Sequence, residues 1–228
     1  MESSRTNFAP ECEQAINQLI QTYQSVTHTY DHLAAACATE EVNMPGFCKF
    51  FRLCSLRNRN ISEHWINWQT MRGGKFVVPE IKPLFQVNEI GQLSIEKMLQ
   101  TATELEKKLE QMVRQLHQTA RSKDDVATCE LIEQKCLQHQ YYVIRMMVNH
   151  VNGVKVSKDA YLYDCMTMTP LVKKINKLLN WRTKQTQSSG GNGQEFLSGS
   201  SHQNWNQKIS NTFDHCPSIR AFLAPIWN

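Results

Sequence analysis

The chain has no run of about 18 apolar residues, so its sequence predicts no membrane-spanning helix. The opening residues, Met1 to Asn7, lack the apolar centre of a secretory signal. The formal net charge of +4 is too small to indicate nucleic-acid binding by itself. We therefore expect a cytoplasmic globular protein with no membrane partner.

The cysteines form no Cys-x-x-Cys pair, which argues against a zinc ribbon or a thioredoxin motif. In the cytoplasm we expect them to stay reduced. Most of them then serve as small buried apolar side chains. The alternative is that a minority crosslink subunits under oxidative stress. The eight are Cys12, Cys37, Cys48, Cys54, Cys129, Cys136, Cys165 and Cys216.

Apolar residues recur at helical spacing in four segments, which predicts four long helices. The second pattern stops at Gly73-Gly74, where glycine favours a helix end. The fourth begins after Asp124-Asp125, whose acids suit a helix start, and is expected to end near Gly153. The four patterns cover residues 16–33, 47–68, 99–116 and 132–151.

The connections predict the topology. Short turns join the first helix to the second and the third to the fourth, so each pair is expected to be antiparallel. About 17 residues, 73–89, separate the second helix from the third, and they include Pro79 and Pro83. A loop of this length is unusual unless it travels the length of a bundle. One long crossover in a four-helix bundle is the ferritin-like topology.

Short motifs spread in order along residues 5–168 carry a resemblance to a known family. They include Lys49-Phe50-Phe51, Gln69-Thr70-Met71-Arg72-Gly73-Gly74, Cys129-Glu130-Leu131-Ile132-Glu133 and Ala160-Tyr161-Leu162-Tyr163-Asp164. On these motifs the chain resembles animal ferritin subunits. The resemblance implies an all-α, ferritin-like four-helix bundle with a short fifth helix over residues 5–168. It also implies a shell of 24 subunits, either a homo-oligomer or a hetero-oligomer with active ferritin subunits.

Ferritins of the active kind hold a di-iron ferroxidase site inside the bundle, and the resemblance places its positions on this chain. Of these positions, Glu106 alone still carries a charge. Two ferrous ions bring four positive charges, which one carboxylate does not balance. No Glu-x-x-His occurs anywhere in the sequence. We therefore predict that the chain is not an enzyme. The corresponding positions are Tyr23, Tyr30, Asn58, Ile61, Glu106 and Gln140.

A structural role accounts for the surviving polar residues. Glu106, Tyr30, Gln140 and Asn58 are expected to form a buried hydrogen-bonded cluster. Arg57 or Arg59, on the second helix, is expected to neutralise the carboxylate.

Light-chain ferritins nucleate mineral with glutamates on the cavity face of the second helix. The matching positions here are Leu53, Leu56, Arg57 and Asn60, and none of them is acidic. Positive charge at such positions repels iron. Iron binding is thus expected to be weak on this face.

The resemblance also places Glu130 and Glu133 at the three-fold channel of the shell, with His117 and Cys129 nearby. Three copies would form rings of carboxylates that attract cations. The alternative is two solvated glutamates, one turn apart on one helical face. These four residues are the predicted metal-binding positions.

Residues 169–228 extend beyond the usual length of the family. We divide them into a basic amphipathic helix over 170–184, a Ser/Gly-rich linker over 185–194 and an aromatic segment over 195–228. The helix is interpreted as an extension of the fifth helix. The other interpretations are a nucleic-acid contact and a membrane-surface helix.

Two functions are consistent with this pattern. The first is a non-catalytic shell subunit in iron storage or iron homeostasis. The second is an iron-free oligomeric chaperone of the kind of artemin, a ferritin relative with a long C-terminal extension. In that case client proteins or RNA would bind through the tail.

Overall fold

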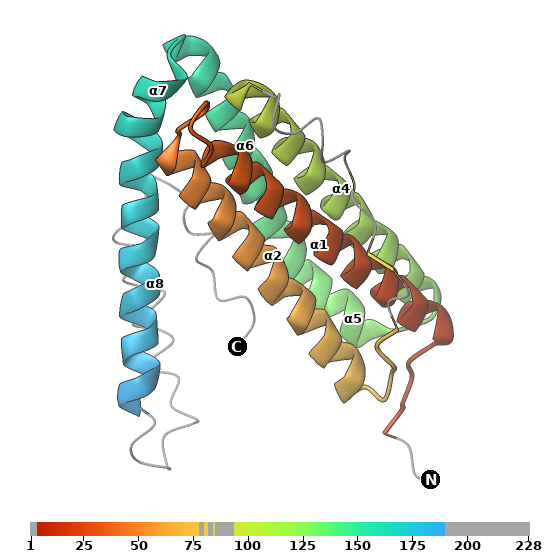
Figure 1. The fold of residues 1–228 in the computed structure, drawn as a ribbon. Coiled ribbons are helices and arrows are strands. Elements are labelled where there is room, and N and C mark those ends of the chain that lie inside the picture. Colours follow the sequence, from red (N-terminus) through yellow and green to blue (C-terminus); the bar gives the residue numbers. More distant parts are fainter. Residues whose placement is uncertain (1–3, 78–79, 82–83, 85–93, 190–228) are drawn as a thin grey trace.

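The computed structural model describes residues 4–77, 80–81, 84 and 94–189, with side chains described as far as Asn180. Every regular element in these ranges is a helix, which confirms the predicted fold class. Figure 1 shows α1, α2, α4 and α6 packed lengthwise in one bundle. No helix in the described ranges is long and apolar enough to span a bilayer.

The first two helices form a tightly packed antiparallel pair, α1 (Pro10–Cys37) and α2 (Pro45–Met71). Each begins with proline, whose missing N–H is not needed in the first turn of a helix. After α2 ends, Gly73 adopts φ of +77°, a backbone conformation that favours glycine. The expected stop at Gly73-Gly74 is confirmed.

The connection from α2 to α4 (Ile95–Ser122) starts by running back along α1. Asn17 of α1 donates from Nδ2 to the carbonyl of Lys75 at 3.1 Å and accepts the Val77 N–H at 3.0 Å. Glu13 accepts the Lys75 N–H at 2.6 Å. These bonds attach the crossover to α1, and α4 begins at the end of the bundle opposite the end of α2 (Figure 1).

The fourth helical segment is longer than its apolar pattern predicted. It comprises α5 (Val126–Leu131), the π-helical turn η1 (Ile132–Cys136) and α6 (Leu137–Ser157). The expected end near Gly153 is wrong, because this glycine makes room for a neighbouring ring. A Cβ at Gly153 would lie 2.5 Å from the Tyr163 hydroxyl oxygen.

The C-terminal helices follow one another directly as α7 (Ala160–Tyr163), the π-helical turn η2 (Asp164–Met168) and α8 (Thr169–Ser189). The predicted division at 168/169 falls inside this continuous helical segment. Helix α8 contacts α2, and its residues Val172 and Ile175 are buried in the hydrophobic core. Helix α8 continues into the segment expected to be a linker, and residues 190–228, with the predicted aromatic segment, lie outside the described residues.

Candidate functional site

A buried ion pair lies at the centre of the bundle. Arg57 of α2 places Nη1 3.2 Å from Oε2 of Glu106 on α4. The Arg57 side chain is 5% exposed and the Glu106 side chain is fully buried. The pair therefore joins two helices at the level where the resemblance placed a metal site.

Two further side chains complete the hydrogen bonds of Glu106. The Tyr30 hydroxyl donates to Oε1 at 2.8 Å, and Gln140 Nε2 donates to Oε2 at 2.6 Å. Arg57 Nη2 in turn donates to Gln140 Oε1 at 3.1 Å. Side chains from α1, α2, α4 and α6 thus form one closed network. Both oxygens of the carboxylate accept bonds from the protein itself.

The surroundings of Arg57 and Tyr30 fix the protonation states of these two side chains. Burial alone lowers the pKa of the Arg57 guanidinium, but the adjacent Glu106 carboxylate raises it, and the net change is upward. Burial, reinforced by the same carboxylate, raises the pKa of Tyr30 well above its ordinary value. The tyrosine is consequently a neutral hydrogen-bond donor, and the guanidinium of Arg57 stays charged.

The remaining predicted positions do not join this network. Asn58 was expected to be part of the cluster, and this is wrong. Its Nδ2 donates to the Cys54 carbonyl at 2.9 Å, one turn back along α2, and its buried Oδ1 has no hydrogen-bond partner in the described structure. Tyr23 and Ile61 are buried in the apolar core. Burial raises the pKa of Tyr23, so its hydroxyl stays protonated.

This set of donors does not fit a pair of iron ions. Glu106 is the sole carboxylate in the network, and its oxygens already accept bonds from Arg57, Tyr30 and Gln140. A fixed guanidinium next to it opposes a second cation.

Of the two arginines expected to neutralise Glu106, Arg57 pairs with it and Arg59 does not. Arg59 is exposed and lies 3.9 Å from Asp31 on α1. Arg57 was also expected on the cavity face of α2 with Leu53, Leu56 and Asn60, and this is wrong. The burial of Arg57 removes it from that face, whereas Leu56 and Asn60 are exposed.

The predicted channel residues lie between α4 and the start of the fourth helical segment. His117 Nε2 is 2.7 Å from Glu133 Oε1, and the Cys129 sulfur is 3.9 Å from the His117 carbonyl. Glu130 instead accepts a bond from Gln134, one turn further along the helix. Within the described part of a single chain, no three His, Cys, Asp or Glu side chains gather for one metal ion.

Asp164 of η2, which the sequence did not single out as functional, anchors the C-terminal helices. Its buried carboxylate accepts the N–H groups of Gly46 at 2.9 Å and Phe47 at 2.6 Å, in the first turn of α2. The N-cap residue Met44 has no side chain that accepts these bonds. A Cβ at Gly46 would lie 2.6 Å from the Asp164 carboxylate, so the glycine leaves room for this contact.

A second contact holds α7 against α6. His150 Nδ1 lies 3.0 Å from the Tyr163 hydroxyl oxygen, and Phe50 packs edge-on against the same imidazole. Burial lowers the pKa of His150 to about 4, so the ring is neutral at physiological pH.

One long crossover and a polar centre shared by α1, α2, α4 and α6 define a ferritin-like helical protein.

Residues 6–156 match the family model for the ferritin-like domain. The chain is 31% identical over 175 residues to the ferritin middle subunit of Salmo salar, and the aligned region covers 74% of this chain and 98% of that protein. It is 29% identical over 169 residues to the soma ferritin of Lymnaea stagnalis, covering 73% and 95%. It is 26% identical over 170 residues to the ferritin light chain of Oryctolagus cuniculus, covering 72% and 95%. The chain belongs to the ferritin family.

Proposed function

We propose that this chain is a shell-forming ferritin subunit that takes part in iron storage without oxidising iron itself. The observation that carries the proposal is the Arg57–Glu106 ion pair, with its 3.2 Å contact in the interior. A guanidinium there supplies the positive charge that would otherwise come from a metal. The buried centre then stabilises the bundle and does not catalyse iron oxidation.

In this role, iron is the cargo of the assembled shell. Co-assembly with catalytically active ferritin subunits would supply oxidised iron to a mixed shell. Glu130 and Glu133 are exposed near the start of the fourth helical segment, which suits carboxylate rings formed by three copies. His117, hydrogen-bonded to Glu133, would neighbour such a ring.

A second function, an iron-free chaperone assembly of the artemin kind, is favoured by one specific observation. Helix α8 runs to Ser189, beyond residue 156, where the family match ends. Client proteins or RNA would then bind the C-terminal extension. This alternative predicts that removal of residues 185–228 weakens suppression of client aggregation.

Rapid mixing of ferrous iron with the purified protein, followed by oxygen consumption, tests the main proposal. We expect the rate to match that of buffer for the chain alone and to rise in mixed shells with an active subunit. Catalytic turnover by the chain alone would contradict it. Iron-free assemblies that exclude active subunits and protect a client would instead establish the chaperone function.

A further inference from the structure

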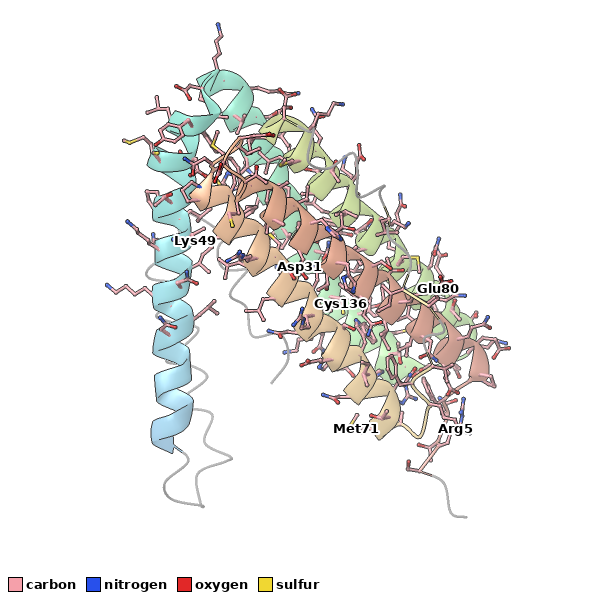
Figure 2. The ribbon with its side chains drawn as sticks, in the orientation of Figure 1. Arg5, Asp31, Lys49, Met71, Glu80 and Cys136 are labelled. Atoms are coloured by element: carbon pink, nitrogen blue, oxygen red, sulfur yellow. The ribbon has the colours of Figure 1, made fainter. Side chains whose placement is uncertain are left out.

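The solvent-exposed faces of α2 and α8 in the single chain carry positive charge with little negative charge between them. Lys49 and Arg52 are exposed on α2, and Lys173 and Lys177 are exposed on α8. The sequence of α8 contains no acidic residue, and α2 contains Glu63 alone. The two helices are adjacent, because α8 contacts α2. Figure 2 shows Lys49 on the side of α2 that is turned towards α8.

These cations are not neutralised within the described structure. None of Lys49, Arg52, Lys173 and Lys177 forms an ion pair with a described carboxylate. The opposite side of the bundle differs, because acids alternate with bases along α4 and pairs such as Arg114–Glu110 form there. The charge is therefore concentrated on one face, which we call the α2–α8 basic face.

The spacing of the charges suits an extended anion better than a single phosphate ion. Lys49 and Arg52 are one turn apart on α2, and Lys173 and Lys177 are one turn apart on the neighbouring α8. On α8, the exposed Asn176 and Asn180 alternate with the lysines. Ammonium, guanidinium and amide groups all donate hydrogen bonds, and phosphate oxygens accept them.

We propose that the α2–α8 basic face binds inorganic polyphosphate, a linear chain of phosphates. Single-stranded nucleic acid offers the same charge, but proteins that bind it usually add aromatic rings on which the bases stack. Among the side chains described on α2 and α8, no aromatic ring is exposed beside these cations. A chain of bare phosphates needs only the donors that are present. The proposal is independent of whether the shell stores iron.

Charge-reversal variants on the α2–α8 basic face and, as a control, on α4 test whether the basic face binds polyphosphate. One variant of the full chain carries Lys49→Glu, Arg52→Glu, Lys173→Glu and Lys177→Glu. Its control carries Lys97→Glu, Lys107→Glu, Lys108→Glu and Arg121→Glu, an equal charge change at exposed positions of α4. Polyphosphate binding is measured by titration calorimetry at several salt concentrations, with single-stranded RNA as a competitor. Acid-labile phosphate in each purified protein reports any polyphosphate already enclosed.

We expect the first variant to bind at least about tenfold more weakly, with a flatter salt dependence, because contacts to phosphates are removed. The α4 control should keep its affinity. Equal effects of the two variants, or neither bound nor co-purified phosphate in the natural chain, would overturn the proposal. Tighter binding of RNA than of polyphosphate would assign the face to nucleic acid instead. If the first variant does not fold, Lys173→Gln with Lys177→Gln serves as a milder test and must also weaken binding.

Discussion

Arg57 and Glu106 meet in the interior of the bundle, with Nη1 3.2 Å from Oε2 and both side chains buried. Each side chain balances the charge of the other, and Tyr30 and Gln140 occupy the remaining acceptor positions of the carboxylate. A buried pair of this kind depends on both members, because loss of one leaves an uncompensated charge. The free energy of unfolding should therefore fall when one member of the pair is replaced, and fall much less when both are replaced by apolar residues.

The first prediction concerns this dependence. Arg57→Met should lower the free energy of unfolding by about 3–5 kcal/mol, because Glu106 is left buried and unpaired. The double variant Arg57→Met with Glu106→Leu should recover most of that loss. Urea unfolding of the two variants measures both effects, and Arg59→Met is the control for an exposed arginine. A loss below about 1 kcal/mol for Arg57→Met would show that the pair is not a structural element.

The second prediction is a gain of activity. Tyr23→Glu, Asn58→Glu and Ile61→His restore carboxylates and a histidine around Glu106, and Arg57→Gln removes the competing cation. This fourfold variant should consume oxygen with ferrous iron. The matched threefold variant that keeps Arg57 should remain slow, because the guanidinium still occupies the carboxylate. Equal oxygen consumption by the two variants would show that Arg57 is not the residue that prevents iron oxidation.

The third prediction concerns the attachment of the C-terminal helices. Asp164→Ala should cost about 0.5–2 kcal/mol, since it removes the acceptor for the first turn of α2. Gly46→Ala should also weaken the contact, because its Cβ would lie 2.6 Å from the Asp164 carboxylate. Both variants should expose the start of α8 to faster amide hydrogen exchange.

Asp159→Ala provides the control for Asp164, since the Asp159 side chain caps α7 alone, through Leu162. Unchanged protection of α8 in Asp164→Ala would show that apolar packing of Val172 and Ile175 suffices to hold the helix.

The fourth prediction concerns pH. Burial lowers the pKa of His150 from 6.5 to about 4, so the unfolded chain takes up this proton at a higher pH than the folded chain. The neutral ring contributes its full stability above pH 6.5, and this contribution is lost as the pH falls from 6.5 towards 4. The difference corresponds to about 3 kcal/mol.

His150→Phe should therefore flatten the fall in Tm between these pH values, while the exposed His28→Gln should leave it unchanged. Part of the fall should persist, because burial also lowers the pKa of His64 to about 4. An identical pH profile for His150→Phe and the natural chain would contradict this account.

The bundle was predictable from sequence because apolar residues at helical spacing mark the face of each helix that is buried. The same reasoning extends to Arg57, which lies three residues after Cys54 and four before Ile61, on the flank of the buried stripe of α2. Arg59 lies further round the helix and is exposed. Helical position thus distinguishes the two arginines proposed to pair with Glu106.

Contacts between distant segments were harder to predict. The sequence predicted a helix end near Gly153, yet α6 continues past it, and the Tyr163 ring fills the space beside this glycine. The Asp164 contact with Gly46 joins residues 118 positions apart, and nothing local to either one predicts it. Asn58 was misplaced because its amide is satisfied by its own helix, through the Cys54 carbonyl.

Anomalous diffraction from crystals soaked anaerobically in ferrous salt shows whether the buried centre binds iron. We predict no iron peak between Tyr23, Glu106 and Gln140, with Arg57 still paired to the carboxylate. Two iron peaks at that place, with the Arg57 side chain displaced, would contradict it.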